Sequence, residues 1–192
     1  RYEGDPVLAF ASPATAERFA RAGVSLVAGE AGEGARAVLV LQADDVDFPE
    51  LERAARAILA GAPLLTGSYV AAYAGAEGPV FSRGAMLTAA LAKVTGARPR
   101  VVGKPSRASV REVSERLGAP AESLVVVGDD VALDVALGRL AGAHTILVRS
   151  GISGADDLGR LPASRRPHET IDGVADLLPR LSGGLTPLHK GV

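Results

Sequence analysis

The 192-residue sequence predicts an α/β fold with a mainly parallel sheet. Short apolar runs alternate with amphipathic helical patterns along the chain, as expected for repeated strand–helix–strand units. Aromatic residues make up only 4% of the chain, which suits close packing of helices on a sheet. The pattern of predicted strands and helices changes near residue 96. We expect a division of the chain there, although no linker rich in proline or serine marks it.

The composition excludes several classes of partner and of chemistry. The formal net charge is -1 and the Lys and Arg residues are scattered, so nothing indicates binding to nucleic acid or to an anionic membrane. The chain has no cysteine, which excludes disulfides and thiolate metal sites. No apolar run approaches the roughly 20 residues that span a bilayer, and no signal peptide is evident. We therefore expect a globular protein of the cytoplasm.

The N-terminal part of the chain contains the first set of predicted elements. Strands are expected at residues 6–10, 24–28 and 37–42, and a strand entering a loop is expected at residues 63–70. Helices are expected at residues 13–23, 47–61 and 86–96, each ending at a glycine. Asp47 is the predicted N-cap of the second helix. Residues 71–85 are expected to form a connection rich in glycine and alanine.

The C-terminal part of the chain contains the second set. We expect strands at residues 100–103, 123–128 and 144–151, and helices at residues 109–117 and 131–141. A last helix is predicted near residues 171–181. The final residues, 182–192, have the composition of a frayed tail.

Three carboxylates follow the predicted strand at residues 123–128. Asp129 and Asp130 come directly after Gly128, and Asp134 lies one helical turn later on the same side. Carboxylates this close repel one another unless a cation or hydrogen-bond donors balance them. Oxygen ligands without His or Cys favour Mg²⁺ over zinc. In the alternative that these residues leave open, Asp130 caps the helix and Asp134 faces water.

Lys104 is the second candidate for chemistry, in the sequence GKPS after the predicted strand at residues 100–103. If this strand and the strand at residues 123–128 are neighbours in one parallel sheet, Lys104 and Asp129 leave that sheet at the same edge. A lysine beside carboxylates and Mg²⁺ neutralises charge on phosphoryl oxygens. A lysine after a strand is usually only solvated, so the hypothesis depends on its pairing with GDDVALD.

Lys104 in GKPS, with Asp129 and Asp134 in GDDVALD, resembles the third and fourth motifs of the haloacid dehalogenase (HAD) superfamily. From about residue 6 to residue 181 the chain is similar to the capped, NagD-like nucleotide and p-nitrophenyl phosphatases. The resemblance implies a Rossmann-like parallel core, with residues 1–96 mostly an α/β cap and residues 97–192 the C-terminal half of the core. It also implies that Lys104 is catalytic and that Asp129 and Asp134 bind Mg²⁺.

The first two motifs of that superfamily are not found in the 192 residues. No DxDGT-like motif, which supplies the nucleophile and the general acid/base, occurs, and the aspartate pairs at residues 44–45 and 156–157 lack its glycine–threonine turn. We therefore expect the C-terminal portion of a phosphatase that works through an aspartyl-phosphate, inactive without an upstream segment. The alternative is a non-catalytic phosphate-binding, metal-binding or scaffold module derived from the same family.

The segment expected to contact the substrate departs from the pattern of the resembled subgroup. Many of its members carry NPD where this chain has GSYV at residues 67–70, so the substrate is not carried over. Ser68, Tyr69, Tyr73 and Arg83 are the candidates for substrate binding. We expect a small phosphorylated metabolite as the partner, and self-association if a sheet lacking strands leaves an apolar edge exposed.

Overall fold

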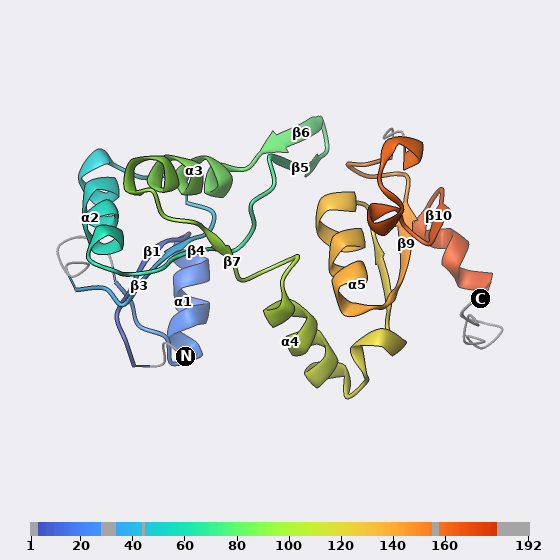
Figure 1. Ribbon diagram of the computed structural model, residues 1–192, viewed down its shortest axis with the longest axis horizontal. Coiled ribbons are helices and arrows are strands. Elements are labelled where there is room, and N and C mark those ends of the chain that lie inside the picture. Colours follow the sequence, from blue (N-terminus) through green and yellow to red (C-terminus); the bar gives the residue numbers. More distant parts are fainter. Residues whose placement is uncertain (1–3, 28–33, 44, 155–157, 180–192) are drawn as a thin grey trace. The chain divides into compact units, whose positions relative to one another are not determined.

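The chain divides into two compact units, Arg1–Glu112 (unit 1) and Val113–Val192 (unit 2). The computed structural model describes residues 4–27, 34–43, 45–154 and 158–179. Each unit contains its own parallel sheet with helices packed against it (Figure 1). The division does not test the assignment of residues 1–96 to a cap and 97–192 to a core, which stays a prediction. No helix in the described part of the chain is long and apolar enough to cross a membrane.

Unit 1 is built on a five-stranded sheet in the order β2-β1-β3-β4-β7. All neighbouring strands in it are parallel. Their bounds are Val7–Phe10 (β1), Leu26–Val27 (β2), Ala37–Val40 (β3), Leu64–Thr66 (β4) and Arg100–Val101 (β7). The sequence predicted each of these strands, because a parallel sheet buried on both faces requires nearly continuous apolar runs.

Helices cover both faces of this sheet. They are α1 (Pro13–Arg21), α2 (Phe48–Leu59) and α3 (Arg83–Thr95). The helix after β7, α4 (Arg107–Leu117), has no buried residue and contains the division between the two units. Leu8 and Val38 pack towards α2 and α3, whereas the alternate residues Val7 and Leu39 pack towards α1. Figure 1 shows α2 and α3 on one face of the sheet and α1 on the other. The alternation of side chains along each strand therefore divides the core into two layers.

Local signals set the ends of the helices. Asp47 caps α2 as predicted, since its Oδ1 accepts a hydrogen bond from Glu50 N at 2.7 Å. The left-handed Gly96, with φ of 69°, ends α3 as predicted. That helix begins three residues earlier than expected, because Ser82 Oγ accepts a hydrogen bond from Ala85 N at 3.1 Å and caps it there.

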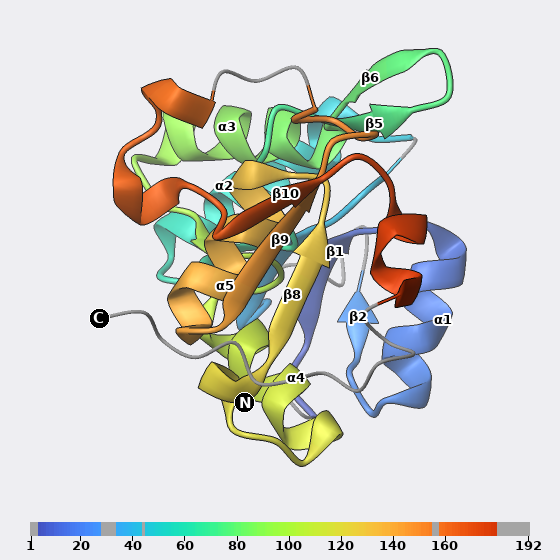
Figure 2. The ribbon, with the colours of Figure 1, turned by 90° about the vertical axis from the view of Figure 1, so that its right-hand side faces the viewer.

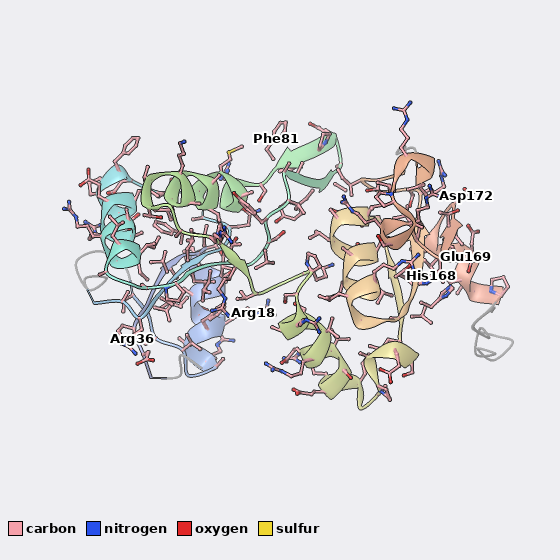
Figure 3. All side chains as sticks on the ribbon, viewed as in Figure 1. Arg18, Arg36, Phe81, His168, Glu169 and Asp172 are labelled. Atoms are coloured by element: carbon pink, nitrogen blue, oxygen red, sulfur yellow. The ribbon has the colours of Figure 1, made fainter. Side chains whose placement is uncertain are left out.

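The connection predicted at residues 71–85 contains an antiparallel hairpin, which the sequence analysis missed. Its strands are β5 (Ala72–Gly75) and β6 (Gly78–Phe81), paired from Ala72 with Phe81 to Gly75 with Gly78. Figure 3 shows Phe81 on this hairpin, where its side chain is exposed. The hairpin leads directly into Ser82 and the start of α3.

Unit 2 contains a three-stranded parallel sheet in the order β10-β9-β8. Figure 2 shows the strands side by side. Their bounds are Val125–Gly128 (β8), His144–Val148 (β9) and Glu169–Ile171 (β10). The helix predicted from residue 171 is wrong in its first part, because Ile171 ends β10; a 3-10 turn, Val174–Leu177, follows, and residues 178–179 are helical. Residues 180–192, including the predicted tail, lie outside the described residues.

The helix predicted at residues 131–141 consists of two parts. A π-helical turn, Val131–Val135, leads into α5 (Ala136–Ala141). Val131 and Val135 pack on Leu147 of β9, so the turn is part of the core of unit 2. A π-helical turn is uncommon and is often found at functional sites, and this one carries Asp134.

Candidate active site

An acidic loop, defined here as residues 129–134, follows the carboxyl end of β8. The carbonyl oxygen of Asp129 accepts a hydrogen bond from Ser153 N at 3.1 Å. Its side-chain Oδ2 accepts another from Ile152 N, also at 3.1 Å. Asp129 is therefore held by the segment that follows β9, at the edge of the sheet where ligands bind in open parallel folds.

Asp130 caps the helical segment that follows it. Its Oδ1 accepts hydrogen bonds from Ala132 N at 2.6 Å and from Leu133 N at 3.1 Å, and the residue is 8% exposed. This is the capping alternative that the sequence left open. Because Oδ1 already accepts two backbone bonds, Asp130 shapes the loop, and its carboxylate is a poorer candidate for metal binding than its neighbours.

Asp134 lies inside unit 2 and does not face water, so that part of the alternative is wrong. It is only 8% exposed, and its Oδ2 accepts a hydrogen bond from Asp130 N at 3.2 Å. The helical turn positions it, because Asp134 N donates to the carbonyl oxygen of Asp130 at 2.8 Å, and Val135 N donates to the same oxygen at 3.2 Å in the five-residue spacing of a π turn. The two residues thus bind each other through backbone and side chain, four positions apart.

Two glycines make room for the carboxylates. A Cβ added to Gly128 would lie 2.2 Å from Cγ of Asp134, and one added to Gly151 would lie 2.0 Å from Oδ2 of Asp129. Both distances are far shorter than any non-bonded contact between these atoms. Only glycine at each position allows the acidic side chains to occupy the places that they have.

The acidic loop offers oxygen ligands of the kind that Mg²⁺ prefers. Asp129 and Asp134 supply carboxylates on one loop, without nitrogen or sulfur donors, so their chemistry fits a hard cation. Within the ranges that the structure describes, no group of three or more His, Cys, Asp or Glu side chains is arranged to hold a metal ion. Two carboxylates alone do not complete a metal site, so water or further oxygen ligands would have to join Asp129 and Asp134.

Lys104 lies at the carboxyl edge of the other sheet, in unit 1. The last residues of β4 and β7 are paired there, and Val102 N donates to the carbonyl oxygen of Thr66 at 2.9 Å. A Cβ on Gly103 would lie 2.1 Å from the carbonyl oxygen of Gly67, so the two backbones are in direct contact. Lys104 therefore leaves the sheet beside the loop that follows β4.

A cavity of about 280 Å³ lies at the same edge of this sheet. Most of the residues around it lie at or just after the ends of β3 and β4 or at the start of α3, with one each from α1 and β5, so two neighbouring parallel strands end at its walls. Its lining residues are Thr15, Val40, Leu41, Gln42, Gly67, Ser68, Tyr73, Ser82 and Gly84. A concave, mostly apolar site with a few polar groups at the carboxyl ends of parallel strands is the usual form of a small-molecule site in α/β folds.

The predicted substrate-binding residues differ in their relation to this cavity. Ser68 and Tyr73 line it, and the loop of Ser68 is held by a hydrogen bond from Thr66 Oγ1 to the carbonyl oxygen of Ser68 at 2.8 Å. Tyr69 is 46% exposed and is not a lining residue. Arg83, the exposed first residue of α3, does not line it either. Contact with substrate stays a prediction for all four residues.

The sequence analysis missed two polar residues of the cavity, Gln42 and Ser82. Gln42 Oε1 accepts a hydrogen bond from Gly84 N at 3.2 Å, which holds the start of α3 against the end of β3. A Cβ on Gly84 would lie 2.5 Å from the carbonyl oxygen of Leu41, so this approach requires glycine. The available signals were a polar residue directly after the strand AVLVL and a serine before a helical pattern.

The two halves of the predicted site belong to different units. β7, which precedes Lys104, pairs with β4 in the sheet of unit 1, whereas β8, which precedes Asp129, pairs with β9 in unit 2. The hypothesis that both strands are neighbours in one sheet is therefore wrong. Lys104 belongs to unit 1 and the acidic loop belongs to unit 2. That they act on the same phosphoryl group is part of the function proposed below.

Comparisons with known proteins identify the family. A family model described as HAD-hydrolase-like matches residues 101–177, which include Lys104 and the acidic loop. The dihydroxyacetone phosphatase of Corynebacterium glutamicum is 38% identical over 136 residues, which are 68% of this chain and 46% of that protein. The chain belongs to the haloacid dehalogenase superfamily. It spans less than half of the length of this haloacid dehalogenase relative.

Solved structures of haloacid dehalogenase phosphatases share the fold. The p-nitrophenyl phosphatase from Archaeoglobus fulgidus matches with a TM-score of 0.77 and 28% identity, over 90% of this chain and 66% of that one. The glycerol phosphate phosphatase of Mycobacterium tuberculosis, solved in complex with calcium, matches with a TM-score of 0.74 and 29% identity, over 91% of this chain and 49% of that one. These neighbours agree with the p-nitrophenyl phosphatase subgroup indicated by the sequence.

Proposed function

We propose that this chain supplies the phosphate-binding, metal-binding and substrate-binding parts of a Mg²⁺-dependent phosphatase. The enzyme hydrolyses a small phosphorylated metabolite through an aspartyl-phosphate, and the nucleophilic aspartate is not among these 192 residues. The observation that carries the proposal is the shared sheet edge in unit 1, where Lys104 leaves β7 beside the cavity that Ser68 lines. Relatives and structural neighbours named as phosphatases support it.

Lys104 would bind the phosphoryl group of the substrate. Its ammonium group neutralises charge on the phosphoryl oxygens, and this interaction strengthens as charge shifts in the transition state. The rest of the substrate would extend from that point into the cavity, because both lie beside the loop that follows β4. Binding of the non-reacting part fixes the phosphoryl group in line for attack.

Asp129 and Asp134 would hold Mg²⁺, which when bound supplies further positive charge to the phosphoryl group. Asp130 keeps the loop in shape through its bonds to Ala132 N and Leu133 N. The calcium complex of the Mycobacterium tuberculosis neighbour supports a divalent cation in this family. Carboxylate oxygens bind either Ca²⁺ or Mg²⁺, and the choice of Mg²⁺ is part of the proposal.

A second candidate function is a binding module that holds phosphate or metal without turnover. The observation that favours it is the lack of a DxDGT-like motif in the 192 residues. This candidate predicts that ligands bind to the product of the complete reading frame but are not hydrolysed by it. The same experiment decides between the two functions.

The test measures Mg²⁺-dependent hydrolysis of p-nitrophenyl phosphate by the 192-residue chain and by the product of the complete reading frame that contains it. We expect no hydrolysis above background from the short chain and robust hydrolysis from the complete product. In that product, Lys104→Ala is expected to lower kcat by about 100-fold or more, the usual effect of removing one group that stabilises transition-state charge.

Lys93→Ala is the matched control, because Lys93 is an exposed lysine in the last turn of α3, at the opposite end of that helix from the cavity. Its activity should equal that of the wild type. Full activity of Lys104→Ala would contradict the role of the lysine, and binding without any turnover would favour the module. A cytoplasmic location and the expectation of no nucleic-acid or membrane partner remain predictions from the sequence.

A further inference from the structure

Residues 149–154, which follow β9, form a turn that folds back on itself. Gly154 N donates to the carbonyl oxygen of Gly151 at 3.2 Å, and Arg149 Nη2 donates to the carbonyl oxygen of Gly154 at 2.9 Å. A Cβ on Gly154 would lie 1.8 Å from the carbonyl oxygen of Arg149, so the turn closes this tightly only with glycine there. The turn is therefore a compact support for the residues that it contacts.

Hydrogen bonds join this turn to the acidic loop. Two of them use backbone donors of the turn: Ile152 N donates to Oδ2 of Asp129, and Ser153 N donates to the carbonyl oxygen of Asp129. Another uses a side chain of the turn, because Ser153 Oγ accepts from Val131 N at 3.2 Å. Ser153 is buried, and its hydroxyl bond is the one of these bonds that a substitution can remove while the backbone donors stay in place.

Val131 N is the backbone donor two residues after Asp129. An aspartate side chain readily accepts a hydrogen bond from the N–H two residues further along the chain. The neighbouring Asp130 makes this bond, since its Oδ1 accepts from Ala132 N at 2.6 Å. Asp129 stands in the same relation to Val131 N, but that N–H is engaged by Ser153 Oγ. The serine thus occupies the donor that the carboxylate of Asp129 would otherwise take.

We propose that Ser153 is a positioning residue for the Mg²⁺ site. By engaging Val131 N, its hydroxyl keeps Asp129 from turning its carboxylate towards the backbone of its own loop. In the described part of the chain Asp129 accepts through Oδ2, from Ile152 N, and no bond to its Oδ1 is found, which leaves that oxygen to a cation. The inference rests on the proposed function, which puts Mg²⁺ at Asp129.

The experiment measures Mg²⁺ binding by calorimetry to the product of the complete reading frame, so it does not depend on turnover. Ser153→Ala frees Val131 N for Asp129 and should raise the dissociation constant of Mg²⁺ about 10-fold or more, the usual effect of losing a group that orients a metal ligand. In hydrolysis of p-nitrophenyl phosphate, the Mg²⁺ concentration at half-maximal rate should rise by the same factor. The kcat at saturating Mg²⁺ and the KM of the ester should change little.

Val131→Pro tests the cause directly and does not depend on the folding of Ser153→Ala. Proline has no N–H and is favoured at the first position of a helix, and the extended Asp130, with φ of -118° and ψ of 117°, suits a following proline. Without this donor Asp129 has nothing to turn towards, so Val131→Pro should keep the wild-type affinity for Mg²⁺. Adding Ser153→Ala to Val131→Pro should have no further effect on that affinity.

Thr145→Val is the matched control. Thr145 Oγ1 also accepts a backbone N–H within unit 2, that of His168 at 3.0 Å, and the buried residue lies near the amino end of β9, whereas the turn follows its carboxyl end. Its replacement should lower Tm without changing the Mg²⁺ affinity.

Three results would each overturn the inference: unchanged Mg²⁺ affinity in Ser153→Ala, an equal loss of affinity in Thr145→Val, or a further loss when Ser153→Ala is added to Val131→Pro. A wild-type product that does not bind Mg²⁺ would overturn the metal site and this inference with it. If the complete product binds Mg²⁺ and the variants behave as expected, but p-nitrophenyl phosphate is not hydrolysed, only the phosphatase proposal fails.

Discussion

Replacing Gly151 by alanine tests how the acidic loop is held. The new Cβ would lie 2.0 Å from Oδ2 and 2.2 Å from Cβ of Asp129. Rotation of the carboxylate cannot relieve both contacts, because Cβ of Asp129 is attached to the backbone. The Asp129 segment must therefore move away from the segment after β9, and the bond from Ile152 N to Oδ2 is stretched or lost.

The cost follows from these contacts. Overpacking of this kind destabilises a protein by about 1–3 kcal/mol, and a lost bond to a charged group has a similar cost of about 1.5–3 kcal/mol. The smaller conformational freedom of alanine in the unfolded chain offsets about 0.4–1 kcal/mol. Because the loop relieves the clash by giving up the bond, we expect a net loss of about 1–3 kcal/mol, or about 2–12 °C in Tm for a chain of this size.

Gly173→Ala is the control for this change. A Cβ at Gly173 meets nothing within 4 Å, and its φ of -144° suits any residue. Thermal unfolding followed by circular dichroism gives the stability of both variants, and calorimetry gives their Mg²⁺ affinity. Equal Tm values for Gly151→Ala and Gly173→Ala would refute the packing argument. A destabilised Gly151→Ala that binds Mg²⁺ with wild-type affinity would remove Asp129 from the metal site.

Two further predictions concern unit 2. The pKa of His168 is lowered from its ordinary value of 6.5, mainly by partial burial and then by the charges of Arg139 and His144. The folded state therefore favours the neutral ring. The unfolding free energy should therefore rise with pH from the lowered pKa up to about 6.5 and stay level above it, and His168→Gln should abolish this rise in thermal melts at different pH. In the described part of the chain β8 pairs only with β9, and Val125 and Val127 on β8 are 43% and 37% exposed, so light scattering should show self-association that Val127→Lys reduces. A monomer at all concentrations would contradict the second prediction.

The surroundings of His168 explain why its pKa is lowered. Figure 3 shows His168 next to Glu169 at the start of β10. The ring of His168 stacks on that of His144 with centroids 4.8 Å apart, and its Nδ1 accepts a hydrogen bond from Thr145 N at 3.0 Å. Its Nε2 is 2.9 Å from Arg139 Nη1. With Nδ1 accepting from Thr145 N, a second proton on the ring would have to go to Nδ1 and face that donor, which agrees with the direction of the pKa shift.

Predictions that depended on neighbouring residues succeeded. The helix start at Asp47 and the end of α3 at Gly96 were predicted because a cap acts within one turn of the helix. That Asp129 and Asp134 lie on one loop also follows from the sequence, and their joint binding of a metal ion stays a prediction. The choice between metal binding and capping for Asp130 could not be predicted, because it depends on where the N–H groups of Ala132 and Leu133 point.

Predictions that depended on distant residues failed or were not made. The β5–β6 hairpin was missed, because alanine and glycine have low strand propensity and its pairing outweighs that preference. Ile171 was assigned to a helix, but its segment forms a strand because it finds a partner in β9, where Ile171 pairs with Val148. The pairing of β7 with β8, on which the hypothesis for Lys104 depended, does not occur, because β7 pairs with β4 and β8 with β9.

The sequence by itself determined the fold class, the position of most elements and the three acidic residues after β8, because apolar periodicity and caps act over a few residues. Only the tertiary structure decided which side chains share the cavity of unit 1. Gln42 and Gly84 are 42 positions apart, and they meet through a hydrogen bond that depends on the packing of α3 against the end of β3. No local pattern records such a contact, because its geometry follows from the pairing order of parallel strands and from the close backbone approach that Gly84 allows.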